Sequence, residues 1–171
     1  MDRMPKVMVV MGSDSDFPVV ESCIKTLKEF AVMTEVYVCS AHRTPDRASE
    51  LSKNAEKDGF DVIIAAAGKA AHLPGVLAAY TPLPVIGLPI ESSTLDGLDS
   101  LLSIVQMPSG IPVATVALDG SVNAALLAVQ IISTRDAVLR KKMIEYKANL
   151  SKKIEIKNKE LRDKIQEGAK L

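Results

Sequence analysis

Short apolar runs alternate along the chain with longer segments in which apolar residues recur every three or four positions. The apolar runs are 6–11 (KVMVVM), 34–38 (TEVYV), 61–67 (DVIIAAA), 84–88 (PVIGL) and 112–118 (PVATVAL). Several are apolar at consecutive positions, which is typical of strands in a parallel sheet that helices cover on both faces. The pattern therefore predicts a strand at each run.

The segments between and after these runs have helical periodicity. They are 15–30, 44–59, 70–80, 93–105 and 121–133. Strands that alternate with helices in this way form right-handed crossover units and a layered α/β fold. We therefore expect a three-layer α/β/α sandwich with a mostly parallel sheet.

The last part of the chain has a different pattern. From Asp136 onward there is no Pro, and the only Gly is Gly168. Apolar residues recur there at helical intervals, at Leu139, Met143, Tyr146, Leu150, Ile154, Leu161 and Ile165. One helix of about 30 residues would be about 45–50 Å long, whereas the preceding body should be about 35–40 Å across. We expect an α/β domain at 1–135 and a helical extension at 136–171 that packs on a neighbouring subunit. The alternative is a helix that wraps on its own domain.

Composition limits the classes of protein to consider. The 171 residues are 47% hydrophobic, enough for one domain with a sizeable core. We expect no membrane span, because no apolar run is long enough, and no signal peptide, because the N-terminal residues lack its features. The two cysteines, Cys23 and Cys39, form no CxxC motif, so a reducing cytoplasm fits best.

The charge is balanced overall but unevenly distributed. From Asp136 onward Lys and Arg outnumber Asp and Glu by 11 to 6, whereas the preceding residues carry 10 against 15. Aromatic residues make up 4% of the chain and there is no Trp. Without a basic, aromatic-bearing body, binding to nucleic acid is not expected.

Polar residues follow the first predicted strand in MGSDSDFP, residues 11–18. Gly12 opens the turn, and Ser13, Ser15 and Asp16 stand at or before the helix start. Free N–H groups at a helix start favour an anion, whereas Asp16 is suited to ribose hydroxyls. Ser and Asp are also preferred helix caps, so capping and ligand binding are equally supported here.

The second strand is followed by SAHRTP, residues 40–45. Thr44 and Pro45 are typical of a helix cap and a first helical residue, which leaves His42 and Arg43 at the strand's carboxyl end. Ligands of open parallel sheets bind at that edge. Arg43 can grip a phosphate or carboxylate, and an imidazole such as that of His42 can transfer a proton in either direction near neutral pH. This pair favours a functional interpretation over a structural one.

The third strand is followed by GKAAHLPG, which holds His72. His72 is either a second site residue or a residue that packs against and caps the next helix, and we favour the second interpretation. Two separated histidines without a cysteine cluster or HExxH make a weak case for a metal. No GxSxG, Walker or GxGxxG motif is present.

Five of these segments together resemble the PurE family of purine biosynthesis. They are MGSDSD, SAHRTP, AGKAAHLPG, LDGLDSLLSIVQMPSGIPVATVAL and NAALLAVQI, which occur in the family's order between about residues 7 and 133. The long C-terminal helix agrees as well. The resemblance implies a flavodoxin-like three-layer α/β/α fold and assembly as a homo-octamer with active sites near subunit contacts.

The resemblance also implies an activity. The expected enzyme is an isomerase that converts 5-(carboxyamino)imidazole ribonucleotide to 4-carboxy-5-aminoimidazole ribonucleotide by decarboxylation and recarboxylation, without cofactor or metal. The position of the family's general acid/base is His42. The substrate-binding positions are Ser13, Asp16, Ser40 and Arg43. The small residues of AGKAAHLPG and of QMPSG (106–110) would let the backbone approach the ring.

One residue departs from the family's pattern. Members usually read AGGAAHLPG, whereas this chain has Lys69 in place of the second Gly. A related branch that fixes free carbon dioxide typically has a basic residue there, so an aminoimidazole ribonucleotide carboxylase is the alternative. Lys69 is expected to steady a carboxylate, to strain a backbone that needs positive φ, or simply to point to solvent. A non-catalytic nucleotide- or flavin-binding protein is a more remote alternative.

Overall fold

Five parallel strands form one sheet in the order β2-β1-β3-β4-β5. They are β1 (Lys6–Met11), β2 (Met33–Val38), β3 (Val62–Gly68), β4 (Val85–Ile90) and β5 (Ala114–Thr115). The computed structural model describes residues 3–93 and 95–168. It divides into two units, Met1–Ile132 and Ser133–Leu171, and the sheet belongs to the first. The predicted parallel sheet is confirmed.

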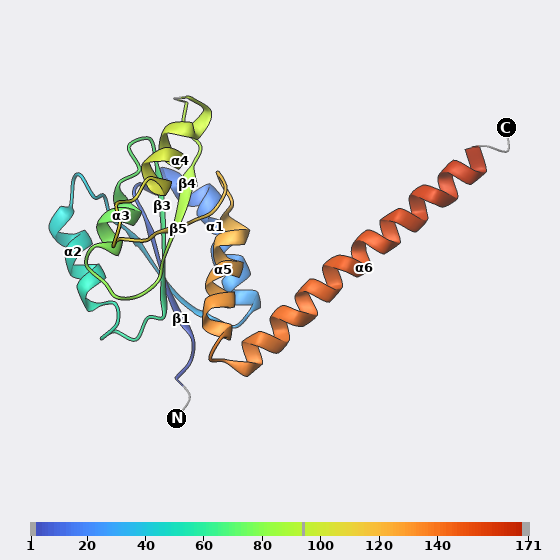
Figure 1. Ribbon diagram of the computed structural model, residues 1–171, viewed down its shortest axis with the longest axis horizontal. Coiled ribbons are helices and arrows are strands. Elements are labelled where there is room, and N and C mark those ends of the chain that lie inside the picture. Colours follow the sequence, from blue (N-terminus) through green and yellow to red (C-terminus); the bar gives the residue numbers. More distant parts are fainter. Residues whose placement is uncertain (1–2, 94, 169–171) are drawn as a thin grey trace. The chain divides into compact units, whose positions relative to one another are not determined.

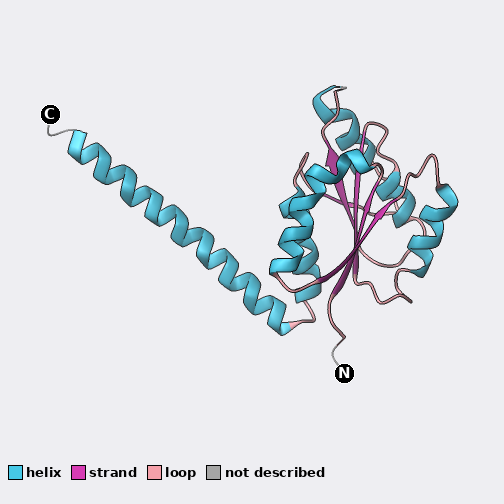
Figure 2. Ribbon diagram, turned by 180° about the vertical axis from the view of Figure 1, so that it is seen from behind, coloured by secondary structure: helices cyan, strands magenta, loops and turns pink. Residues whose placement is uncertain are grey.

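Helices cover both faces of this sheet. They are α1 (Phe17–Glu29), α2 (Pro45–Asn54), α3 (Leu73–Ala78), α4 (Leu98–Val105) and α5 (Ser121–Ser133), with short 3-10 turns η1 (Asp14–Asp16) and η2 (Leu95–Gly97). Helices α1 and α5 share one face, where Ser22 Oγ lies 2.5 Å from Ser121 Oγ, and α2, α3 and α4 lie on the other (Figures 1 and 2). The three-layer α/β/α expectation is therefore confirmed.

The core lies on both sides of the central strands. Every residue of β4 is buried, and so is every residue of β3 except Gly68. On one side of the sheet, Met8, Ile63 and Phe60 pack with Leu73 and Leu77 of α3. Strands buried on both faces read as continuous apolar runs, which is why this part of the sequence pattern was informative.

The fifth strand is much shorter than predicted. The run 112–118 suggested a full strand, but only Ala114 and Thr115 pair with β4. The cause is a proline on the neighbouring strand. The carbonyl of Pro89 accepts a hydrogen bond from Asp119 N, and Pro89 has no N–H to donate to the same side. The ladder between β4 and β5 therefore ends after two residues.

Three helices are also shorter than expected. The predicted helix 93–105 begins only at Leu98, after the 3-10 turn η2. The predicted helix 44–59 ends at Asn54, where Ala55 N bonds to Ser52 O, three residues back. Residues 55–59 continue as turns, which close at Gly59, with a φ of 83°, and at the bond from Phe60 N to Ala55 O. The predicted helix 70–80 begins only at Leu73. Before it, Ala71 N bonds to Lys69 O and His72 N bonds to Ala70 O, both at 2.8 Å, which are tight turns and not helical bonds.

The second unit contains one long helix, α6 (Ala137–Gly168). Asp136 caps its start, since Leu139 N donates to Asp136 Oδ1 at 2.9 Å. Its 32 residues would span about 48 Å at ~1.5 Å per residue. Large apolar side chains along it are exposed, at Ile144, Leu150, Ile154, Ile156, Leu161 and Ile165. Across residues 3–93 and 95–168, no helix combines the length and the apolar character needed to cross a membrane.

Candidate active site

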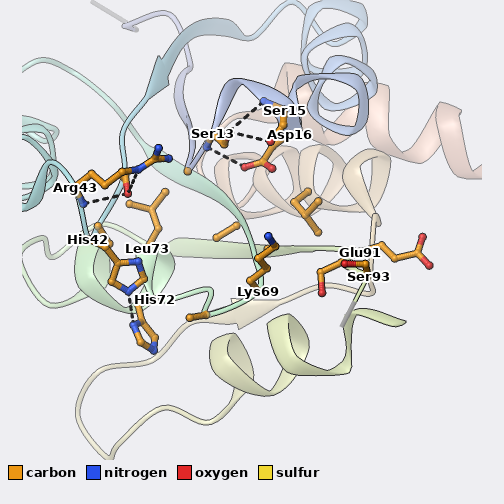
Figure 3. Close-up of a pocket in the computed structure, with 18 residues that line it drawn as sticks. Ser13, Ser15, Asp16, His42, Arg43, Lys69, His72, Leu73, Glu91 and Ser93 are labelled. Atoms are coloured by element: carbon orange, nitrogen blue, oxygen red, sulfur yellow. Dashed lines mark hydrogen bonds between the residues drawn. The ribbon is translucent and has the colours of Figure 1, made fainter. Parts of the chain in front are cut away.

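A pocket of about 770 Å³ opens at the carboxyl ends of the first four strands. Its wall contains the nine candidate residues that follow the first three strands (Figure 3): Gly12, Ser13, Ser15, Asp16, Ser40, His42, Arg43, Lys69 and His72. Parallel strands bring their carboxyl ends to one edge, so residues that lie far apart in the sequence meet there.

The turn after β1 is organised by reciprocal capping. Ser13 N donates to Asp16 Oδ2 at 3.1 Å, and Ser15 N donates to Ser13 Oγ at 3.3 Å. These bonds start η1, which leads directly into α1. The capping interpretation therefore accounts for the local bonds of Ser13 and Asp16, while both residues also line the pocket.

Burial perturbs the carboxyl group of this turn. Desolvation raises the pKa of Asp16 above its ordinary value of 3.8, and hydrogen bonds from the turn oppose this rise. Asp16 is 8% exposed, so its side chain is held at the base of the turn. A fixed carboxylate oxygen in a partly desolvated wall is a suitable acceptor for a hydroxyl of a bound sugar.

The loop after β2 is closed by Thr44. Thr44 Oγ1 accepts from Ser40 N at 3.0 Å and donates to Ser40 O at 2.9 Å, and Thr44 N also donates to Ser40 O. Thr44 stands at the cap position of α2, as predicted, but its hydroxyl does not cap the helix. The bonds instead fold residues 40–44 into a tight loop that presents His42 and Arg43 at the pocket.

Ser40 and Arg43 form the cationic side of the pocket. Arg43 N and Nε donate to Ser40 Oγ at 3.2 and 3.4 Å. Because the Ser40 oxygen accepts these bonds, its own hydrogen remains available to a ligand. A hydroxyl and a guanidinium that point the same way can together bind an anionic group.

The two histidines contact each other directly. His42 Nε2 lies 2.8 Å from His72 Nδ1, and the ring centroids are 4.9 Å apart at an angle of 69° (Figure 3). One ring must donate and the other accept, so the bond fixes the tautomer of each ring relative to the other. It leaves His42 Nδ1 for a ligand.

Our expectation that His72 packs against and caps a helix is wrong. His72 stands at the cap position of α3, but its side chain makes no capping bond and is exposed. The reason is that its ring turns toward His42 across the pocket edge. A contact between residues 30 positions apart has no local sequence signal.

Lys69 follows β3 with a backbone φ of 56°. This is the left-handed region, which glycine adopts readily and other residues adopt at a cost. Of the three alternatives for Lys69, the strained backbone is therefore confirmed, and the residue is also exposed. Its side chain belongs to the pocket wall (Figure 3).

Sequence reasoning missed one part of the wall. Glu91, Ser92 and Ser93, which follow β4, also line the pocket. Their position after a parallel strand was the available signal. The segment 106–110, by contrast, does not contribute to the wall of this pocket. Within the described residues, no group of three or more His, Cys, Asp or Glu side chains is placed to hold a metal ion.

Comparison with known proteins gives consistent results. A family model described as AIR carboxylase matches residues 6–153. The N5-carboxyaminoimidazole ribonucleotide mutase of Pyrococcus horikoshii is 55% identical over 159 residues, which cover 93% of this chain and 90% of that protein. The phosphoribosylaminoimidazole carboxylase of Candida albicans is 55% identical over 150 residues, which cover 88% of this chain and 26% of that protein.

A solved structure agrees with the observed fold. The crystal structure of Treponema denticola PurE superposes with a TM-score of 0.79 at 31% identity, covering 88% of this chain and 94% of that one. The similarity therefore extends over most of both chains.

Proposed function

This chain belongs to the AIR carboxylase family, and we propose that it is a mutase of purine biosynthesis. It converts 5-(carboxyamino)imidazole ribonucleotide to 4-carboxy-5-aminoimidazole ribonucleotide. The name and high identity of the Pyrococcus horikoshii relative support this assignment. The observation that carries it is the pocket in which the His42 imidazole adjoins an anion-binding arginine and serine.

The phosphate of the nucleotide binds where β1 and β2 end. Ser13, Ser40 and Arg43 supply hydroxyl and guanidinium donors there, all on the pocket wall. Asp16, buried at the base of its turn, accepts from the ribose hydroxyls. Gly12 and Ser15 complete this part of the wall and hold the turn in place.

His42 is the general acid and base of the reaction. When carbon dioxide leaves, the electron pair of the broken bond stays on the exocyclic nitrogen. That nitrogen takes a proton from His42 Nδ1, which gives aminoimidazole ribonucleotide. The ring carbon then attacks the retained carbon dioxide, and His42 takes the proton from that carbon. One imidazole can do both because it transfers protons in either direction near neutral pH.

His72 positions His42 for this task. His42 Nε2 is hydrogen-bonded to His72 Nδ1 at 2.8 Å, so the ring nitrogen of His42 that remains for the substrate is His42 Nδ1. A protonated His42 can keep donating from Nε2 to His72, so the contact also steadies the charged ring. His72 is thus a positioning residue, in the sense that it acts through His42.

Carbon dioxide must remain beside the ring between the two steps. Ala41, Ala67, Leu73 and Ile90 are apolar residues of the pocket wall, and Ala41 and Leu73 directly adjoin His42 and His72 in the chain. Carbon dioxide is uncharged and suited to such a wall, and exclusion of water slows its loss to solvent. The proposed reaction itself requires no metal or cofactor.

Direct carboxylation is the second candidate. Lys69 and the name of the Candida albicans relative favour an enzyme that fixes free carbon dioxide onto aminoimidazole ribonucleotide. The mutase is preferred because His72 and Arg43 keep the mutase pattern that the PurE resemblance implies.

A paired-substrate assay separates the two activities. The purified protein is given either 5-(carboxyamino)imidazole ribonucleotide without bicarbonate or aminoimidazole ribonucleotide with bicarbonate, and formation of the carboxylated product is followed. The mutase uses the first substrate efficiently, and efficient use of the second pair alone would establish the carboxylase. His42→Asn should abolish turnover while nucleotide still binds, since general acid–base catalysis contributes about 10²–10⁴-fold.

We also propose that the protein is a cytoplasmic homo-oligomer, in line with the octamer implied by the PurE resemblance. Exposed apolar side chains recur at Leu95, Leu98, Leu102 and Val105 around α4. Others lie along α6, which would pack on a neighbouring subunit. Cys23 and Cys39 are free and buried, as suits a reducing compartment.

A further inference from the structure

Lys69 occupies a position where a side chain is costly to keep. Its φ of 56° is natural for glycine and unfavourable for residues with a Cβ. Non-glycine residues held in this region tend to occur at functional sites, where another requirement outweighs the strain. The question is therefore what the Lys69 ammonium contributes.

The ammonium has no partner within the described residues. It forms no ion pair with Asp16 or Glu91, the two carboxylates of the pocket wall, and no hydrogen bond to a described side chain is present. Figure 3 shows the side chain rising from the end of β3 into the open middle of the pocket. An unpaired cation inside a ligand pocket is available to an anion of the ligand.

The order of the strands places Lys69 two strands away from Arg43 and one strand away from Ser13. Ser13 follows β1 and Arg43 follows β2, whereas Lys69 follows β3, on the opposite side of β1 from β2. Strands lie about 4.8 Å apart, so the β2 and β3 ends are separated by about 10 Å. A ribonucleotide carries its phosphate and its base on opposite sides of the ribose, so the base lies toward β3.

The histidine contact leads to the same assignment. His42 comes from the β2 side, yet its ring meets His72, which follows β3 as Lys69 does. The proton-transferring imidazole therefore reaches the β3 end of the pocket. The carboxyl group that migrates must lie close to that imidazole, and hence on the side of the pocket from which Lys69 projects.

We propose that Lys69 binds the carboxylate of the carboxylated nucleotide and thereby lets the pocket distinguish carboxylated from decarboxylated nucleotides. This inference rests on the proposed function. The carboxylated nucleotide has two anionic ends, and the pocket wall has two basic side chains, Arg43 after β2 and Lys69 after β3. Decarboxylated aminoimidazole ribonucleotide lacks the second anionic end.

The expected effect follows from the strength of such a contact. A hydrogen bond to a charged group contributes about 1.5–3 kcal/mol, which corresponds to about 10- to 150-fold in affinity. Loss of the ammonium should therefore raise Kd and KM for carboxylated nucleotides by at least about tenfold. Affinity for aminoimidazole ribonucleotide should not change, and kcat should not fall, because the contact is made to the bound carboxylate and weakens as that carboxylate becomes carbon dioxide.

Three variants test this. Lys69→Gly removes the charge and relieves the backbone, so it should fold at least as well as the parent protein. Lys69→Met removes the charge but keeps the bulk and the left-handed backbone, and Lys69→Arg keeps a cation. Kd is measured by calorimetry for 4-carboxy-5-aminoimidazole ribonucleotide and for aminoimidazole ribonucleotide, together with kcat and KM of the mutase reaction.

The control is Ala31→Gly. Ala31 has a φ of 59° and is exposed in the turn before β2, outside the pocket wall. It reproduces the backbone relief of Lys69→Gly without touching the ligand, and it should leave both affinities unchanged.

The results separate this inference from the proposed function. The inference is supported if Lys69→Gly and Lys69→Met lose affinity for the carboxylated nucleotide alone and Lys69→Arg recovers it. An equal loss of affinity for both nucleotides would indicate that Lys69 binds the phosphate, and unchanged affinities would indicate that it points to solvent. Either result overturns the inference but leaves the parent's mutase activity intact. Loss in Lys69→Gly alone would indicate loop flexibility and would also overturn it. A parent protein that does not isomerise the substrate would instead refute the proposed function.

Discussion

Replacement of His72 tests how the catalytic imidazole is held. His72 makes one hydrogen bond to His42, at 2.8 Å, and one edge-to-face ring contact, with centroids 4.9 Å apart. A net hydrogen bond contributes about 0.5–1.5 kcal/mol, and an aromatic contact of this kind adds up to a similar amount at a buried site. Both rings are exposed, so the lower half of the combined range applies. The lower half of that range is about 1–2 kcal/mol, so His72→Leu should lower kcat by about 5- to 30-fold, since 1.4 kcal/mol is tenfold.

The matched variant is His72→Asn. The bonded atom of His72 is Nδ1, and the amide group of asparagine places a hydrogen-bonding atom close to that position. His72→Asn should therefore stay within about threefold of the parent, because it can restore most of one hydrogen bond. KM should be unchanged in both variants, since His72 does not bind the phosphate or the ribose in the proposed arrangement.

Steady-state kinetics of the two variants, with circular dichroism to show that both are folded, provides the measurement. Equal impairment of His72→Leu and His72→Asn would show that the hydrogen bond does not position His42. A loss as large as that of His42→Asn would show that His72 itself handles a proton. Either result would refute the reasoning.

Three further predictions concern the core, the buried carboxyl group and α6. Gly87→Ala should lower the free energy of unfolding by about 1–3 kcal/mol in urea titrations, because the added Cβ would lie 2.3 Å from Ile104 Cγ2 and 2.9 Å from Val113 Cγ1; an unchanged midpoint would mean that these side chains yield freely. Burial raises the pKa of Asp16, so the folded protein binds this proton more tightly than the unfolded chain, and stability is lost as pH rises above the ordinary value of 3.8. Asp16→Asn lacks this titration, so its free energy of unfolding should increase relative to the parent's as pH rises above that value, and parallel pH profiles would contradict the assignment. Ile154→Lys and Leu161→Lys, at exposed apolar positions of α6, should lower the oligomer's mass in light scattering without loss of helicity. The control Asn158→Lys should leave the mass unchanged, and equal masses for all three variants would show that α6 does not take part in the assembly.

The pattern of apolar runs predicted most of the fold for a physical reason. Strands β3 and β4 are buried on both faces, so their sequences are apolar throughout and bounded by polar turns. Strand β5 escaped this reasoning because its length depends on Pro89, a residue of another strand. Local patterns do not report which hydrogen-bonding groups a neighbouring strand lacks.

The candidate site could be predicted from the sequence about as well as the fold. Residues such as Ser13 and Arg43 follow strands of a parallel sheet, and that placement alone brings them to one edge. The orientation of the His72 ring could not be predicted, because it is set by contact with His42 from another loop. For Lys69, resemblance to a glycine-bearing motif predicted the strained backbone, but only the structure places its side chain in the pocket wall.

The bonds between Thr44 and Ser40 have a consequence for inhibitor design. They order the loop that carries His42 and Arg43 before any molecule enters the pocket. Association with a preformed receptor avoids the loss of conformational entropy that ordering a mobile loop would add. A compact, rigid dianion matched to this preformed surface should therefore gain more affinity than a larger flexible one.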